Sequence, residues 1–328
     1  MTTTRLTRRA ALRLALGGGA ALAVAGRERG RLYERVGLAF GTTVSIKLEA
    51  QDAAAAERAL AAGFAEIRRV DRVASLTRER GDVFRLNRDG CLSNPDPALI
   101  EMLRVARAMH EATDGAYDVT VQPLWLALDA AAKRGTWPSE AEIAEILRRV
   151  DQTKLRFDET RVAFAEPGMS VTLNSLARGL AADKVAAALR REGVERAFID
   201  TDVLAARGRR PDGGAWSAGV RDPRDGDRVI AVSPLDGCLS TSGDYEYSWS
   251  ADFARHHILD ARRGVSPADY ASVSVLAPSG LWADALSTSA FLVGAEKAPT
   301  LLRRFTAEAL FVEKSGAISR TPGFAVRA

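Results

Sequence analysis

The chain has 328 residues, of which 47% are hydrophobic and 27% are charged, an ordinary globular composition with ample length for a large core. Its net charge of +4 and its pI of 9.2 suggest a basic protein, but four arginines lie in the first 25 residues, which contain no acid. The remaining 42 basic residues balance 42 acidic ones, so charge gives no case for nucleic acid as a partner.

The N-terminus predicts an export signal. A twin-arginine pair, Arg8 and Arg9, precedes a weakly hydrophobic stretch rich in Ala, Leu and Gly, and residues 23–25 (AVA) satisfy the small-residue cleavage rule. The apolar run is too short to span a bilayer comfortably. The cleavage site lacks the Cys that a lipoprotein would need there. We therefore predict a twin-arginine signal peptide over residues 1–25 and a soluble periplasmic protein over residues 26–328.

The first elements after the signal are a strand and two helices. Residues 43–48 (TVSIKL) alternate and are rich in β-branched types, which predicts a strand. Residues 53–73 carry apolar side chains at helical spacing, which predicts an amphipathic helix. Asp96 as N-cap and Pro97 as first helical residue predict a second helix that runs to about Thr113.

Two more helices and several short strands follow. Ser139 and Glu142 form a capping box, and a later helix spans about 175–192 with Gly193 as its stop. The strands are predicted at residues 155–157, 162–164, 170–173, 197–200, 229–232, 272–276 and 309–312. Strict βαβ alternation and nucleotide-binding glycine motifs are missing, so the order favours an α+β fold over a doubly wound one. The Gly-, Arg- and Asp-rich residues 207–228 are interpreted as a surface excursion.

Polar residues that could carry chemistry gather in five stretches. They are residues 40–46 (FGTTVSI), 113–125 (TDGAYDVTVQPLW), 173–179 (LNSLARG), 240–264, which contains the pair His256 and His257, and 282–294 (WADALSTSAFLVG). Asp284 precedes Thr288 by four positions, so both lie on one helix face. The pair could mark a helix start, or it could supply hard oxygen ligands for Mg²⁺.

The remaining histidine and the two cysteines have plain interpretations. His110 lies on the apolar face of its helix and is interpreted as a core residue. Cys91 and Cys238 could form a disulfide in an oxidising compartment, but two unpaired small side chains fit the sequence equally well.

The order and spacing of the stretches resemble the ApbE-type FAD:protein FMN transferases. The matched motifs are FGTTVSI, a segment at 71–87 ending in DVFRLN, TDGAYDVTVQPLW, LARGLAAD, STSGDYE, HHILD and SVSVLAPSGLWADALSTSAFLVG. The resemblance implies a two-lobed α+β fold with mixed or antiparallel sheets and packed helices. It also implies that Mg²⁺ is required, that FAD is the substrate, and that FMN is transferred to a Thr or Ser hydroxyl of an acceptor protein with release of AMP. We expect this acceptor to be a membrane redox protein.

The resemblance also implies roles for individual residues. Asp284 and Thr288 match the metal-binding Asp and Thr, and Ser175 matches the residue whose backbone carbonyl supplies a third ligand. His257 matches the histidine that we assign as the base for the acceptor hydroxyl. The cofactor-binding positions are the triplet Ala116, Tyr117 and Asp118, together with Phe40, Thr77, Thr172 and Arg178.

Several of these positions depart from the family pattern. Met is usual where Phe40 stands, an aromatic residue near Thr77, Asp at Thr172, and Lys or Glu at Arg178. Residues 200–202 (DTD) replace a Gly-Gly-Asp turn whose glycines would permit positive φ and close backbone approach to a ligand. The altered cradle leaves two alternatives open: a non-catalytic module that binds flavin or a partner, and a Mg²⁺-dependent FAD pyrophosphatase.

Overall fold

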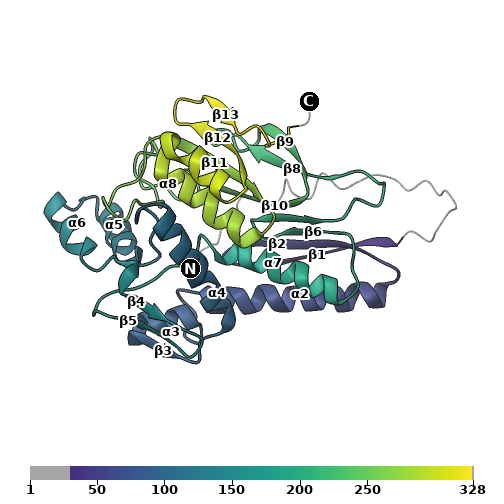
Figure 1. The fold of residues 1–328 in the computed structure, drawn as a ribbon, viewed down its shortest axis with the longest axis horizontal. Helices are drawn as coiled ribbons and strands as arrows, with labels where there is room; N and C mark the ends of the chain where they lie inside the picture. Colours follow the sequence, from purple (N-terminus) through teal and green to yellow (C-terminus); the bar gives the residue numbers. More distant parts are fainter. Residues whose placement is uncertain (1–29, 327–328) are drawn as a thin grey trace.

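The computed structural model describes residues 30–326, so the predicted signal peptide lies outside the described residues. An antiparallel sheet of eight strands forms the centre of the molecule, in the order β1-β2-β6-β7-β10-β11-β12-β13 (Figure 1). Its strands are β1 (Arg31–Ala39), β2 (Thr42–Ala50), β6 (Ala197–Asp200), β7 (Leu204–Arg207), β10 (Gly237–Gly243), β11 (Tyr270–Ala277), β12 (Glu308–Glu313) and β13 (Ile318–Arg320). Within the described chain, no helix has the length and apolar character needed to cross a bilayer.

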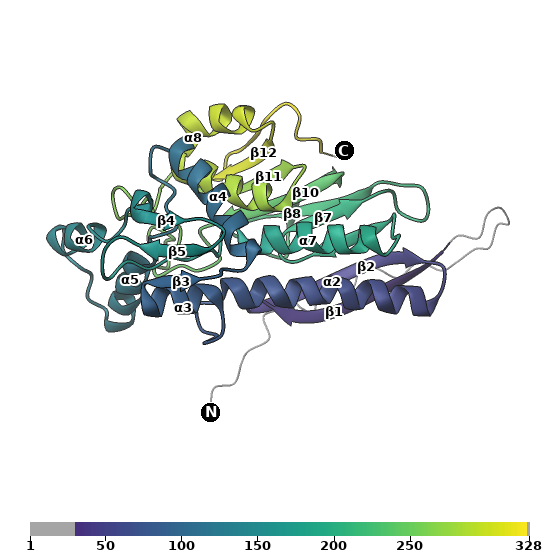
Figure 2. The same ribbon diagram turned by 60° about the horizontal axis from the view of Figure 1, so that its bottom comes forward.

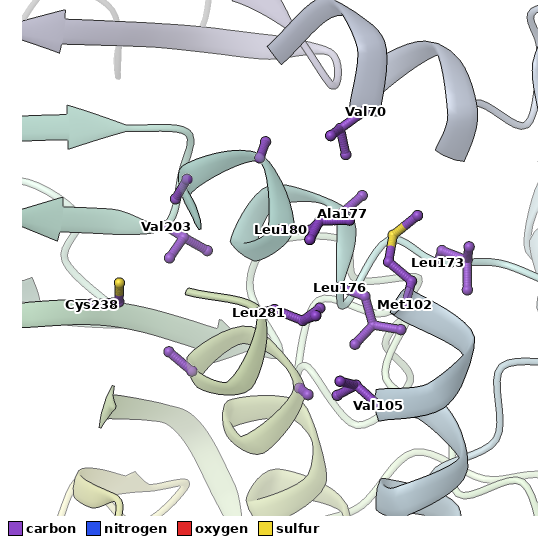
Figure 3. Close-up of a cluster of buried hydrophobic side chains, with 14 of the residues drawn as sticks. Val70, Met102, Val105, Leu173, Leu176, Ala177, Leu180, Val203, Cys238 and Leu281 are labelled. Carbon is purple, nitrogen blue, oxygen red and sulfur yellow. The ribbon is translucent and has the colours of Figure 1, made fainter. Parts of the chain in front are cut away.

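Four long helices lie on one side of this sheet: three of them contact its strands, and the fourth, Pro97–Ala112, packs against the other three. They are α2 (Ala53–Ala74), α4 (Pro97–Ala112), α7 (Ala177–Arg191) and α8 (Gly280–Arg304). Figure 2 shows α2 running along the β1–β2 hairpin, with α7 beside it. Side chains from α2, α4, α7 and α8 meet in one core, where Val70, Met102, Leu180 and Leu281 converge (Figure 3). This apolar core fixes the relative positions of the helices.

The opposite face of the sheet is covered by a small hairpin, β8 (Trp216–Arg221) with β9 (Val229–Leu235). Trp216, Val220 and Leu235 pack there with Phe324, which is fully buried. The interpretation of residues 207–228 as a surface excursion was therefore wrong for β8, whose alternate side chains belong to a second core.

A smaller lobe lies at one end of the large sheet, on the left in Figure 1. It contains a three-stranded sheet and three short helices: β3 (Cys91–Ser93), β5 (Arg161–Phe164), β4 (Leu155–Phe157), α3 (Asp82–Asp89), α5 (Gln122–Arg134) and α6 (Glu140–Leu147). A single 3₁₀ turn, Gln152–Lys154, leads into β4. The arrangement agrees with the predicted α+β, two-lobed architecture, and every strand ladder of the described chain is antiparallel.

Most predicted elements are confirmed. The Asp96 cap, the Ser139–Glu142 capping box and the stop at Gly193, whose φ is 76°, all occur as expected. Residues 170–173 were wrongly predicted as a strand, since they form only an isolated bridge between Ser170 and Val121. Instead, the backbone amide of Val171 donates to Oδ1 of Asn87 at 2.7 Å, and Nδ2 of Asn87 donates to the carbonyl of Val171 at 2.9 Å.

The two cysteines are far from forming a disulfide. Cys91 is exposed in β3, Cys238 is buried in β10, and both are free. The unpaired alternative is therefore confirmed.

Candidate active site

A cavity of about 380 Å³ lies where α7, α8 and the loops after β10 and α4 meet. Its wall contains eight of the predicted site residues: Tyr117, Asp118, Thr172, Ser175, Arg178, His257, Asp284 and Thr288. A second cavity of about 260 Å³ adjoins it, sharing Leu76, Asn174 and Arg178 with the first, and is lined by Phe40 and Thr77. Ala116 lines neither cavity, because it is fully buried and its carbonyl accepts the amide of Ala261 at 3.1 Å.

A glycine contact brings α7 against α8 at the floor of the larger cavity. A Cβ on Gly179 would lie 2.1 Å from the carbonyl oxygen of Gly280, and a Cβ on Gly280 would lie 2.5 Å from the oxygen of Gly179. Asp183 of α7 then caps the start of α8 by accepting the amides of Gly280 and Leu281 at 2.7 and 3.0 Å. Only residues without a side chain permit this approach, and it places the start of α7 beside Asp284.

Asp284 is a buried carboxylate on α8, only 7% exposed. Its oxygens accept the amide of Gly179 at 3.0 Å and the hydroxyl of Ser240 at 3.2 Å. Burial raises the pKa of Asp284 to about 6, so its negative charge is poorly compensated by the protein alone. Since Ser279 is the N-cap of α8, the spacing of Asp284 and Thr288 does not mark a helix start.

The residues around Asp284 fit a magnesium ion. Thr288 lies one turn further along α8, and its hydroxyl is 2.9 Å from that of Ser242. The amide of Gly179 donates to Asp284 rather than to the carbonyl of Ser175 four residues earlier, so this carbonyl is spared the usual helical bond. A carboxylate, a hydroxyl and a carbonyl are hard oxygen donors that suit Mg²⁺ with water completing its shell. In residues 30–326, no cluster of three or more His, Cys, Asp and Glu side chains offers an alternative metal site.

The adjacent histidines have different environments. His256 is fully buried, its Nε2 lies 3.1 Å from the carbonyl of Pro267, and burial lowers its pKa to about 4. His257 lines the cavity, and its Nδ1 lies 3.2 Å from the carbonyl of Tyr247. Desolvation, together with the charge of Arg178, lowers the pKa of His257, which keeps this imidazole neutral near neutral pH. His257 is thus the member of the pair that can accept a proton in the cavity.

The interpretation of His110 as a core residue was wrong. Its side chain is 19% exposed, and its Nδ1 lies 3.3 Å from Asp118 and 3.1 Å from the carbonyl of Tyr117. The hydrogen bond to Asp118 raises the pKa of His110. The other bonds of Asp118, from the amides of Thr120 and Gln152 at 2.7 and 2.8 Å, show that this carboxylate braces the loop at the cavity wall.

Tyr117 reaches the start of α7 from the same loop. Its hydroxyl is 2.8 Å from the hydroxyl of Ser175, and burial raises its pKa. The bond engages the Ser175 side chain, while the carbonyl of Ser175 is the one that receives no helical bond from Gly179. The loop and the start of α7 are therefore locked together at the wall of the cavity.

The altered turn at residues 200–202 causes less change than its sequence suggests. Asp202 alone has positive φ, 73°, so neither lost glycine stood at a position that needs one in this chain. Thr201 is buried and donates its hydroxyl to the carbonyl of Arg178 at 2.9 Å. Asp202 lines the cavity, whereas Asp200 and Thr201 do not.

Two polar atoms at the cavity wall lack hydrogen-bond partners among the described residues. They are Nε of Arg178, which lies 3.7 Å from Asp202, and Oγ1 of Thr172. Buried polar atoms without partners are uncommon in folded proteins and mark positions where a ligand can complete the bonding. A guanidinium and a hydroxyl in the wall of one cavity suit a phosphate-bearing ligand.

Several cavity residues were missed by sequence reasoning. Trp125 and Tyr247 form an aromatic part of the wall, and Ser242 connects the hydroxyls of Ser287 and Thr288 at 2.9 Å each. Ser242 belongs to the STSGDYE motif, which was the available signal. The contribution of Trp125 depends on a contact with a loop more than 100 residues later, which no local pattern reveals.

Comparisons with known proteins give one consistent result. The family model described as the ApbE family matches residues 40–311. A FAD:protein FMN transferase from Treponema pallidum is 30% identical over 315 residues, covering 88% of this chain and 86% of the relative. A protein of the same name from Klebsiella pneumoniae is 29% identical, covering 87% and 90%.

Solved structures agree with these relatives. The flavinyl transferase ApbE of Pseudomonas stutzeri, in its apo form, is similar with a TM-score of 0.80 and 30% identity, covering 92% of this chain and 98% of that one. The ApbE protein of Thermotoga maritima gives a TM-score of 0.77 at 30% identity, covering 90% and 98%. Similarity therefore extends over nearly the whole of both solved chains.

Proposed function

This chain belongs to the ApbE family, and from that premise we propose that it is a Mg²⁺-dependent FAD:protein FMN transferase. Its substrates are FAD and an acceptor protein, and its product is FMN joined through a phosphoester to a Thr or Ser hydroxyl of the acceptor. The observation that carries the proposal is one cavity that gathers a buried carboxylate, a helix hydroxyl and a neutral histidine: Asp284, Thr288 and His257.

The geometry supports a direct displacement at phosphorus. The acceptor oxygen attacks the phosphorus of the FMN half of FAD, the bond to the bridging oxygen breaks, and AMP leaves with that oxygen. His257 accepts the proton of the acceptor hydroxyl at Nε2, because its Nδ1 is engaged by the carbonyl of Tyr247. Because the pKa of His257 is lowered, its imidazole is already neutral at neutral pH and can accept this proton directly.

The remaining residues hold the diphosphate. Mg²⁺, when bound, neutralises the charge that builds on the phosphates as the bond breaks. Asp284, Thr288 and the carbonyl of Ser175 would hold it. Arg178 and Thr172, with their unsatisfied atoms, bind the phosphate and flavin portions of FAD. Phe40 and Thr77 in the adjoining cavity contact the other end of the dinucleotide.

The central experiment mixes purified protein, FAD, Mg²⁺ and a Thr-containing acceptor, and measures covalent flavin on the acceptor by in-gel fluorescence and mass spectrometry. We expect labelling by the wild type and none by Asp284→Ala. Thr288→Val should be defective, whereas Thr288→Ser should retain transfer, because Ser keeps the ligand oxygen. No covalent flavin from the wild type, with Asp284→Ala indistinguishable from it, would refute the proposal.

The same experiment separates the two alternatives. Free FMN and AMP released without acceptor would indicate a pyrophosphatase, and tight FAD binding without AMP release would indicate a binding module.

We also propose that residues 1–25 direct export by the twin-arginine route and that the acceptor is a membrane redox protein facing the periplasm. Replacing Arg8 and Arg9 together by Lys should leave the protein in the cytoplasmic fraction and the acceptor without flavin. Normal periplasmic recovery of this variant would contradict the assignment of the signal.

A further inference from the structure

The loop between β10 and β11 folds back on itself beside the cavity. The amide of Trp249 donates to the carbonyl of Arg255 at 2.8 Å, and the amide of His257 donates to the carbonyl of Tyr247 at 3.0 Å. An isolated antiparallel bridge between Ser248 and His256 lies between these bonds. His257 is thus held on the return arm of a small hairpin, with Tyr247 opposite it.

The same carbonyl of Tyr247 lies 3.2 Å from Nδ1 of His257. A neutral imidazole carries its proton on either nitrogen, and the hydrogen bond made by one nitrogen decides which. A carbonyl can only accept, so this contact selects the form with the proton on Nδ1 and leaves the lone pair on Nε2. A displacement of the Tyr247 carbonyl away from Nδ1 would remove this selection.

Tyr247 is anchored by a carboxylate on α5. Its hydroxyl donates to Oδ1 of Asp129 at 2.7 Å, and Nε1 of Trp249 donates to the same oxygen at 3.2 Å. Lys133 donates to Oδ2 of Asp129 at 2.7 Å. Asp129 is only 8% exposed, and its bonds from Lys133 and Tyr247 lower its pKa, so it is ionised at neutral pH.

Aromatic packing makes the anchor rigid. The ring of Trp125 lies 5.6 Å from that of Tyr247 and 6.0 Å from that of Trp249, and the last two meet edge to face at 6.1 Å. The three side chains and Asp129 form a clamp between α5 and the hairpin, a contact that joins residues 118 positions apart. Trp125 and Tyr247 line the cavity, whereas Asp129 and Trp249 do not, so Asp129 can act on the contents of the cavity only through its neighbours.

We propose that Asp129 is a positioning residue, which acts through Tyr247 to fix the tautomer and orientation of His257 in the transfer reaction. The inference rests on the role of His257 proposed above. It assigns the aromatic clamp a function in catalysis beyond its contribution to the core.

The test uses three variants of the full protein. Asp129→Ala removes the acceptor for both donors, Asp129→Asn keeps one acceptor oxygen, and Lys133→Ala removes only the exposed partner of Asp129, since the Lys133 side chain is 72% exposed. We expect kcat of Asp129→Ala to fall between about tenfold and a hundredfold with the KM for FAD little changed. Asp129→Asn should recover much of the rate, and Lys133→Ala should match the wild type.

Imidazole ¹⁵N NMR reports the tautomer of His257 directly, and this tautomer would not change if Asp129 had only a structural role. The chain has only 3 histidines, so the ring signals of His257 can be assigned by its replacement. We expect a single form with the proton on Nδ1 in the wild type and in Lys133→Ala, and a mixture of both forms in Asp129→Ala. A wild-type ¹⁵N pattern in Asp129→Ala, whether or not its melting temperature falls, would overturn the proposal.

His257→Ala separates this inference from the proposed function. If His257→Ala transferred FMN at the wild-type rate, His257 would not be the base, and the positioning role of the clamp would be refuted as well. An inactive His257→Ala together with a fully active Asp129→Ala would refute the clamp alone.

Discussion

A single methyl group at Gly179 tests whether the contact between α7 and α8 sets the geometry of the cavity. The Cβ of Gly179→Ala would lie 2.1 Å from the carbonyl oxygen of Gly280 and 2.8 Å from Cβ of Asp284. Neither neighbour is the end of a flexible side chain, so the two helices must separate by roughly 1 Å to restore van der Waals contact. The separation also stretches the 3.0 Å bond between the Gly179 amide and Asp284.

The expected magnitude follows from this clash. Overpacking of a core costs about 1–3 kcal/mol, and a backbone clash belongs at the upper end of that range. At about 2 °C per kcal/mol for a chain of this size, the melting temperature should fall by about 6 °C. Because Asp284 moves relative to the Ser175 carbonyl, the Mg²⁺ concentration for half-maximal transfer should rise at least about tenfold.

The assay combines thermal melting followed by circular dichroism with a Mg²⁺ titration of acceptor labelling. Gly226→Ala is the matched control, because a Cβ there has no atom within 4 Å and should change neither quantity. If Gly179→Ala melts within about 1 °C of the wild type and needs no additional Mg²⁺, the reasoning about the helix contact is refuted.

Three further predictions concern separate contacts. Thr288→Val should raise the Mg²⁺ concentration for half-maximal labelling about tenfold or more, while Thr288→Ser should not. Equal defects in the two variants would show that the Thr288 hydroxyl is not a ligand. The pKa of His110 is raised by Asp118, so its stabilisation is complete below about pH 6.5 and is lost as the pH rises through the raised folded value. His110→Gln should therefore lower the urea midpoint more at about pH 5.5 than at about pH 9, and the reverse order would contradict this. Arg224 donates two hydrogen bonds, of 2.7 and 2.8 Å, to the fully buried Asp244. Arg224→Ala should therefore lower the free energy of unfolding measured in urea by about 3 kcal/mol, and adding Asp244→Asn in a double variant should restore part of this loss.

Local signals predicted much of the secondary structure, because they depend on residues within one turn of each other. The Asp96 cap and the Ser139–Glu142 box are examples, since their side chains bond to amides two or three residues away. The strand wrongly predicted at residues 170–173 has the right local pattern. Its backbone is instead bonded by Asn87, which lies 84 positions away and carries no local sign of that role.

The site was predictable in part for the same reason. The four-residue spacing of Asp284 and Thr288 places both on one face of α8, and both line the cavity. The close approach of Gly179 to Gly280 and the bond from Tyr247 to Asp129 join distant parts of the chain. Spacing rules cannot reveal such contacts, because they arise only when the helices and the loop pack together.

The contact between α7 and α8 has a consequence for biosynthesis. Asp284 is bonded to an amide 105 positions earlier in the sequence, and Asp183 caps a helix that begins almost a hundred residues after it. A nascent chain on the ribosome therefore has no complete cavity until α8 has left the exit tunnel. The proposed FAD and Mg²⁺ sites can form only after synthesis has passed this helix.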